Sequence, residues 1–172
     1  MRELLIIQPS SLGDIAHALQ VTASIKAQQP EWRVSWIVRD IFAPLVRASL
    51  VVDQVFVFRR HGGVRGFLQL MREVRERRFE VVMDFQGLLR SGLMIKWTHA
   101  QRKIGRLDAI EGATFFYDEK VAWPKPGRGH PLEMLLQFCV AVGAKPTLPG
   151  PLLFRDHAKL NLSFMEPHKG LR

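Results

Sequence analysis

Residues 8–19, Q-P-S-S-L-G-D-I-A-H-A-L, combine two hydroxyls, a glycine and a carboxylate at the start of a predicted helix. The hydroxyls of Ser10 and Ser11 suit a polar ligand, and Gly13 permits close approach of the backbone. The free N–H groups of a helix N-terminus favour a phosphate or a sugar. Asp14 is either a helix cap, the commoner role of Asp at such a place, or a general base for a substrate hydroxyl. The spacing matches neither a dinucleotide fingerprint nor a P-loop.

A second polar cluster, D-F-Q-G-L-L-R-S, occupies residues 84–91. Its Gln86 and Gly87 could hold a polar ligand, and Arg90 could bind an anion. The structural alternative is a loop in which Asp84 or Gln86 satisfies the N–H groups of the following helix. The residue types alone leave both roles open.

A third cluster is basic and follows a predicted strand. Residues 59–78 contain seven arginines and two glutamates. Arginine forks bind phosphates and carboxylates through two hydrogen bonds, so Arg59, Arg60 and Arg65 are candidates for an anionic ligand. The later arginines are expected to form a solvated helix face that is partly paired with Glu73 and Glu76. These are Arg72, Arg75, Arg77 and Arg78.

The composition is that of a globular protein of one ordinary domain, with 172 residues and a formal net charge of +9. The positive charge predicts a polyanionic partner, which could be a nucleic acid, an anionic membrane surface or a phosphorylated substrate. We find neither a membrane span nor a signal peptide. The single Cys139 excludes an internal disulfide, and the six histidines show no metal-ligand spacing. We therefore predict a cytoplasmic protein without a metal site.

The elements that must position these clusters are strands that alternate with helices. The strands are solid apolar runs, which predicts a Rossmann-like α/β fold with a parallel sheet and helices on both faces. The three polar clusters then lie at the carboxyl ends of strands, where open parallel sheets bind ligands. Strands are expected at 4–7, 34–38, 55–58 and 81–83, with weaker candidates at 103–105, 120–122 and 151–156, and helices at 14–29, 41–50, 64–78, 88–97 and 131–142. Residues 106–118 are expected to be irregular.

The end of the chain differs from the rest. Residues 145–151 contain three prolines and are typical of a linker. We therefore assign residues 1–150 to one domain and residues 151–172 to the start of a connection to another.

Several segments together resemble a known family. M-R-E-L-L-I-I-Q-P-S-S-L-G-D-I-A-H-A-L, V-S-W-I-V-R-D-I-F-A-P-L-V, F-E-V-V-M-D-F-Q-G-L-L-R-S and the helix H-P-L-E-M-L-L-Q-F-C-V-A-V-G are similar to the ADP-heptose:lipopolysaccharide heptosyltransferases of glycosyltransferase family 9. The resemblance covers residues 1–155. It implies the N-terminal half of a GT-B fold, in which this domain takes the acceptor and a C-terminal domain takes the ADP-heptose donor. We expect the donor domain to be missing here, and the chain to be inactive alone.

The resemblance also implies roles for residues. Asp14 would be the general base of an inverting transfer, in a cleft lined by Ser11, Leu12 and Gly13. The anionic acceptor, with its Kdo carboxylates and lipid A phosphates, would be bound by Arg59, Arg60, Arg65 and Arg90, with Arg106 as a weaker candidate. The family often has a basic residue where this chain has Gln8. No cofactor is implied, and the protein would contact the cytoplasmic face of the inner membrane peripherally.

Two alternatives remain open on the sequence. The first is a non-catalytic basic Rossmann-like domain that binds anionic lipid or nucleic acid. Against nucleic acid, the chain lacks interleaved aromatic and basic residues and any recognition-helix motif, so we expect no nucleic-acid partner. The second is a transferase that uses another nucleotide sugar.

Overall fold

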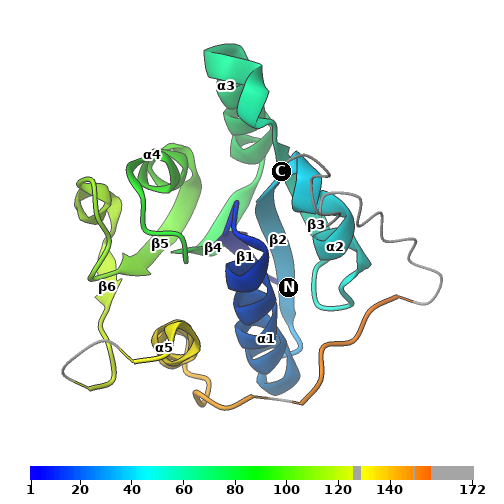
Figure 1. Cartoon of the computed structure of the whole chain (residues 1–172), viewed down its shortest axis with the longest axis vertical. Helices are drawn as coiled ribbons and strands as arrows, with labels where there is room; N and C mark the ends of the chain where they lie inside the picture. The colour runs from blue at the N-terminus through cyan, green and yellow to red at the C-terminus, as the bar shows by residue number, and fades with distance from the viewer. Residues whose placement is uncertain (126–128, 149, 156–172) are drawn as a thin grey trace, which may run out of the picture.

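The computed structural model describes residues 1–125, 129–148 and 150–155. Its centre is a six-stranded, fully parallel sheet with the strand order β3-β2-β1-β4-β5-β6 (Figure 1). The strands are β1 Arg2–Ile7, β2 Trp32–Arg39, β3 Gln54–Phe58, β4 Arg78–Asp84, β5 His99–Arg106 and β6 Glu119–Val121. This architecture confirms the predicted Rossmann-like fold.

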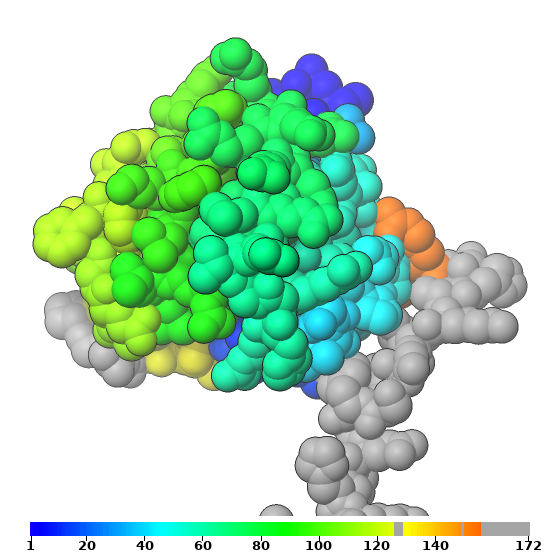
Figure 2. Space-filling view, turned by 90° about the horizontal axis from the view of Figure 1, so that it is seen from above, coloured from blue at the N-terminus to red at the C-terminus, as the bar shows by residue number. Residues whose placement is uncertain are grey.

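Helices cover both faces of the sheet (Figure 1). One face carries α1 Leu12–Gln28, α2 Ala43–Ala48 and α5 Pro131–Ala141, and the other carries α3 Gly63–Arg75 and α4 Leu89–Trp97. Figure 2 looks onto the second face, where α3 and α4 lie side by side. Short 3₁₀ turns are η1 Asp40–Phe42, η2 Arg60–Gly62 and η3 Ala113–Phe116. None of the helices in the described part of the chain is long and apolar enough to cross a membrane.

The central strand β1 explains why the strands are continuous apolar runs. Leu4 and Ile6 pack into the core under α1, whereas Leu5 and Ile7 pack into the core under α3 and α4. All four side chains are fully buried. A strand that is covered on both faces needs apolar residues at every position rather than at alternate ones.

The order of the strands creates a switch point at β1. The chain runs from β1 outward through β2 to β3, and then returns to place β4 on the other side of β1. The loops after β1 and β4 therefore leave the sheet in opposite directions and open a crevice between them at the carboxyl edge. The first and second polar clusters of the sequence belong to these two loops.

Some boundaries differ from the predicted ones. Strand β5 has eight residues where only 103–105 were expected, because its first half is polar and lies partly exposed near the end of the sheet. Helix α3 ends at Arg75, since Phe79 is buried as part of β4. The predicted strand at 151–156 is wrong for its described residues, which form only an isolated bridge between Phe154 and Ser49. Residues 156–172 lie outside the described residues.

Candidate functional site

The loop after β1 begins helix α1 with a capping box. Ser11 is the N-cap residue, and its backbone nitrogen and Oγ lie 3.0 and 2.8 Å from Oδ2 of Asp14. Asp14 therefore stands at the third helical position, and the prediction that it would be the N-cap itself is wrong, because the helix starts at Leu12. Its Oδ1 has no hydrogen-bond partner among the described residues. One carboxylate oxygen thus holds the loop, and the other is free.

The loop after β4 is organised by Asp84, whose side chain is 0% exposed. Its Oδ1 accepts hydrogen bonds from the backbone nitrogens of Gln86 and Gly87 at 3.0 and 3.1 Å. Its Oδ2 accepts one from the phenol of Tyr117 at 2.7 Å. Burial raises the pKa of Asp84 to about 6, although the hydrogen bonds from Ser91, Tyr117 and the two amides lower it. The structural alternative is thus partly correct: Asp84 satisfies N–H groups of its own turn.

Gln86 joins this loop to the loop after β1. Its Oε1 accepts hydrogen bonds from Nε2 of Gln8 at 3.2 Å and from the backbone nitrogen of Ser10 at 3.3 Å. Gln8 is 2% exposed, and its carbonyl oxygen accepts a bond from Nε1 of Trp36 at 3.2 Å. Gln8, where the family often has a basic residue, is therefore a buried amide that connects the two loops.

A hollow of about 350 Å³ at the carboxyl edge is lined by Asp14, by the loop after β4 and by residues at the end of β5 and after β5 and β6. The structure brings four of the predicted site residues to its wall, namely Asp14, Gln86, Gly87 and Arg106. Gly87 has a φ of +71°, and a Cβ atom there would lie 3.2 Å from Cβ of Ala109, so the position requires glycine. The wall is completed by Leu88, Asp108, Ala109, Ile110, Trp123, Gly129 and Pro131.

Arg106 lines this hollow as an ion pair rather than as a free cation. Its Nε and a terminal nitrogen each lie 2.9 Å from an oxygen of Asp108, and Nε1 of Trp123 also donates to Asp108 at 2.8 Å. The hydrogen bonds from Arg106 lower the pKa of Asp108. Sequence reasoning missed Asp108 and Trp123, although the spacing of Arg106 and Asp108 directly after a strand was a usable signal.

A second hollow, of about 520 Å³, lies between the N-terminal ends of α3 and α4. Arg60 and Arg90 line it together with mainly apolar side chains, and the Arg90 guanidinium carbon lies 5.5 Å from the ring centroid of Phe58. The apolar part of the wall is Phe58, Val64, Phe67, Leu89 and Leu93, and the rest is Gly63 and Glu111. Arg59 and Arg65 are exposed and do not line it. The structure thus divides the predicted arginine set between this hollow, the first hollow and the surface.

Of the later arginines, Arg72 and Arg75 lie exposed on α3, as expected, whereas Arg77 and Arg78 follow the helix, so the predicted helix face is wrong for these two. The predicted pairing of the arginines is also wrong. Among the described residues, neither Glu73 nor Glu76 forms an ion pair with them. Arg75 instead lies 3.1 Å from Nε2 of His99. His130 has a structural role, because its Nδ1 accepts the backbone N–H of Leu132 at the start of α5.

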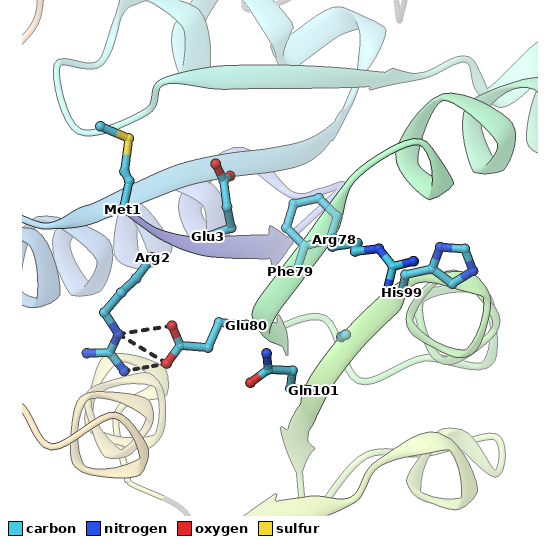
Figure 3. A pocket seen from close by; sticks show the side chains of 9 residues that line it. Met1, Arg2, Glu3, Arg78, Phe79, Glu80, His99 and Gln101 are labelled. Atoms are coloured by element: carbon cyan, nitrogen blue, oxygen red, sulfur yellow. Dashed lines mark hydrogen bonds and ion pairs between the residues drawn. The ribbon is translucent and has the colours of Figure 1, made fainter.

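A further hollow of about 520 Å³ lies at the opposite, amino edge of the sheet (Figure 3). There the guanidinium of Arg2 binds both carboxylate oxygens of Glu80 at 2.7 and 3.1 Å and stacks 3.9 Å over the ring of Trp32. The charges of Arg2 and Glu80 are therefore paired with each other. Because parallel sheets bind ligands at the carboxyl edge, we place the candidate site at the hollow beside Asp14.

The chain is similar in sequence to lipopolysaccharide heptosyltransferases. No family model matches the chain. It is 24% identical over 150 residues to the lipopolysaccharide core heptosyltransferase OpsX of Haemophilus influenzae, which covers 86% of this chain and 42% of that protein. It is 26% identical over 93 residues to a lipopolysaccharide heptosyltransferase 1 of Campylobacter coli, covering 54% and 27%. The curated relatives named here are thus matched over less than half of their length.

Solved structures show the same fold. The E. coli heptosyltransferase WaaC with ADP superposes with a TM-score of 0.74 at 22% identity, over 84% of this chain and 49% of that one. A family 9 glycosyltransferase from Veillonella parvula gives a TM-score of 0.76 at 14% identity, over 90% and 44%. The predicted resemblance to glycosyltransferase family 9 is confirmed, and the chain corresponds to about half of these structures.

Proposed function

We propose that this chain is the acceptor-side domain of an inverting heptosyltransferase of lipopolysaccharide synthesis. The support is its similarity to proteins of that name and its fold, which it shares with WaaC structures that hold ADP and ADP-2-deoxy-2-fluoro heptose. Since the chain matches about half of those structures, we assign residues 1–150 to acceptor binding and residues 151–172 to the connection toward a donor-binding domain.

The observation that carries the proposal is the position of Asp14 on the wall of the hollow at the carboxyl edge, opposite residues that follow β4, β5 and β6. Ser11 holds Oδ2, which leaves Oδ1 to accept a proton. In the proposed reaction Oδ1 takes the proton of an acceptor hydroxyl while the hydroxyl oxygen attacks the anomeric carbon. The bond from that carbon to the ADP oxygen breaks on the opposite face, so the configuration is inverted and ADP leaves.

The acceptor is proposed to bind along the same edge of the sheet. The Ser10 hydroxyl, the backbone of Leu12 and Gly13, and the turn at Gly87 would contact the sugar. Arg60 and Arg90 would bind carboxylates or phosphates in their partly apolar hollow, and the exposed Arg59 and Arg65 would add to the positive potential. Arg106, oriented by Asp108, would contact the ligand from the far wall. An acceptor embedded in a membrane would bring the protein to the cytoplasmic face of the inner membrane.

The alternatives are not favoured by the comparisons. A basic module that binds nucleic acid or lipid without catalysis would not account for the similarity to named heptosyltransferases over 86% of the chain. A transferase with another nucleotide sugar has no comparable support, because two of the solved neighbours are WaaC with ADP or an ADP-heptose analogue.

The test is heptose transfer by the complete gene product that contains this chain. ADP-heptose and a Kdo-terminated lipid A acceptor should yield a heptosylated product by mass spectrometry. Asp14→Asn should lower kcat by about 10²- to 10⁴-fold, the range of a lost general base. The control is Asp40→Asn, an exposed carboxylate at the carboxyl end of β2 that does not line the hollow. Normal kcat for Asp14→Asn would rule out the base, and absence of any transfer would rule out the activity.

A further inference from the structure

A continuous path of hydrogen bonds leads from the buried carboxylate of Asp84 to the carboxylate of Asp14. Asp84 holds the backbone nitrogen of Gln86, and Oε1 of Gln86 accepts the backbone N–H of Ser10. The next residue, Ser11, donates both its backbone N–H and its hydroxyl to Asp14. The two ends of the path belong to the loops after β4 and β1, which are 70 residues apart in the chain (84 against 14) and adjacent only in the sheet.

The Gln86 side chain is the only link of this path that crosses between the two loops. Its Oε1 accepts two bonds, from Ser10 and from the buried Gln8, so both lone pairs of that oxygen are used. Gln8 also donates to the carbonyl oxygen of Ser10. Both bonds to Oε1 of Gln86 are partly buried, and such a bond constrains geometry more strongly than a fully exposed one. Gln86 thus fixes the position of Ser10, the residue before the N-cap Ser11 of α1.

The carboxylate of Asp84, which holds Gln86, is itself fixed by Tyr117 from the segment between η3 and β6. Asp84 and Gly105 are partners in the register of β4 and β5. The ring of Tyr117 lies over Gly105, where an added Cβ would come within 2.4 Å of three ring atoms. The phenol reaches Asp84 through the space that a side chain at Gly105 would fill. Both oxygens of Asp84 are therefore occupied, and its turn presents Gln86 in one orientation.

We propose that Gln86 and Asp84 are positioning residues for Asp14, acting through the Gln86 carbonyl oxygen on the loop that carries the base. This inference rests on the proposed role of Asp14. It also changes the expected role of Gln86, whose side chain would hold the loop after β1 and would not bind the substrate. Loss of the oxygen should displace Asp14 and lower kcat. Loss of the amide nitrogen alone should have little effect.

Two substitutions separate these possibilities. Gln86→Met keeps the length of the side chain and removes both polar atoms, whereas Gln86→Glu keeps an acceptor oxygen and removes the donor. In the chain, we expect Gln86→Met to speed amide hydrogen exchange at Ser10 and Ser11 by about tenfold or more, and Gln86→Glu to leave it within about threefold of the wild type. Gln69→Met is the control, because Gln69 is exposed on α3 and lines neither hollow. Unchanged exchange in Gln86→Met would overturn the proposal.

The kinetic measurement uses the complete gene product. Gln86→Met should lower kcat by about 10- to 100-fold with the acceptor KM within about twofold, and Gln86→Glu should restore most of kcat. A raised KM with normal kcat in both variants would instead identify Gln86 as a substrate contact and overturn the proposal. If the gene product transfers no heptose, the proposed function fails, while the exchange measurement still decides whether Gln86 holds the loop.

Discussion

The phenol oxygen of Tyr117 lies 2.7 Å from Oδ2 of Asp84, and the ring of Tyr117 covers Gly105 on the neighbouring strand. The tyrosine comes from the segment between η3 and β6, so this contact ties the end strand to the loop that faces the proposed base. Glycine at position 105 is required because the ring occupies the place of a side chain. Neither Tyr117 nor Gly105 was singled out from the sequence.

Gly105→Ala should destabilise the fold by about 1–3 kcal/mol, the usual cost of forcing an atom into a packed core. The added methyl would come within 2.3 Å of the Tyr117 ring and would displace the phenol from Asp84. Urea unfolding followed by circular dichroism measures the loss. Gly66→Ala is the matched control, because it lies inside helix α3 with no atom nearer than 3.9 Å and should be neutral or stabilising. Equal effects of the two substitutions would contradict the packing described for Tyr117.

The stability of the fold should depend on the ionisation of Asp84. Folding raises the pKa of Asp84 from its ordinary value of about 4 to about 6, so its contribution to stability is full below about pH 4 and is lost as the pH rises through 6. The phenol of Tyr117 does not titrate in this window, because burial and the nearby Asp84 raise its pKa.

Asp84→Asn isolates this effect, since asparagine does not titrate. The free energy of unfolding of the wild type relative to Asp84→Asn should fall by up to ~3 kcal/mol between about pH 4 and pH 7. Urea unfolding of both proteins at a series of pH values gives this difference in free energy. Folding lowers the pKa values of Glu80, Glu119 and Asp108, so these groups contribute with the opposite sign. Their contributions cancel in the difference because both proteins contain them. Parallel curves for the two proteins would contradict the burial of an ionisable Asp84.

The capping role of Asp14 can be separated from its proposed catalytic role. Ser11→Ala and Asp14→Ala should each lower the free energy of unfolding by about 1 kcal/mol. Their effects should add incompletely, because both remove the bond from Ser11 Oγ to Asp14 Oδ2, whereas the bond from the backbone N–H of Ser11 is lost only in Asp14→Ala. Asp14→Asn keeps an acceptor oxygen and should stay within about 0.5 kcal/mol of the wild type. A double-mutant cycle by urea unfolding tests this, and additive losses would show that the two side chains stabilise α1 independently.

Arg60 and Arg90 should account for much of the affinity for an anionic acceptor. Because both line the hollow between α3 and α4, Arg60→Gln and Arg90→Gln should each weaken binding of a Kdo-terminated lipid A fragment by about tenfold. Arg72→Gln removes the same charge from an exposed position of α3 outside this hollow and should have a much smaller effect. Calorimetric titration of the complete gene product at low and high salt measures the affinity of each variant and its dependence on salt. Equal effects of all three would indicate a general electrostatic field rather than a site.

The Arg2–Glu80 pair at the amino edge should be of minor energetic importance. Its side chains are 36% and 32% exposed, so water and salt screen their attraction, and Glu80→Gln should lower the free energy of unfolding by less than about 1 kcal/mol. The pairing lowers the pKa of Glu80, so its contribution is present at neutral pH and is lost in acid. Urea unfolding at low and high salt is the measurement. A loss that is large and independent of salt would contradict the screening of this pair.

The sequence by itself determined the layered α/β architecture and the edge at which the polar clusters lie. Solid apolar runs such as residues 4–7 require burial on both faces, and helical spacing of apolar residues is likewise a local property that can be read without coordinates. The prediction was less accurate at β5. There the strand is defined by its hydrogen bonds to β4 and β6, because its own residues are largely polar.

The tertiary structure alone decided which polar groups meet. Gln8 contacts Gln86, and Tyr117 contacts Asp84, only because the strand order places β1, β4 and β5 next to one another. The same packing brings Arg60 and Arg90, which come from the segments after β3 and β4, to one hollow. The type of a residue, which the sequence gives, limits the groups that its side chain can bind. Its partners depend on contacts between residues distant in the chain, which form when the sheet assembles.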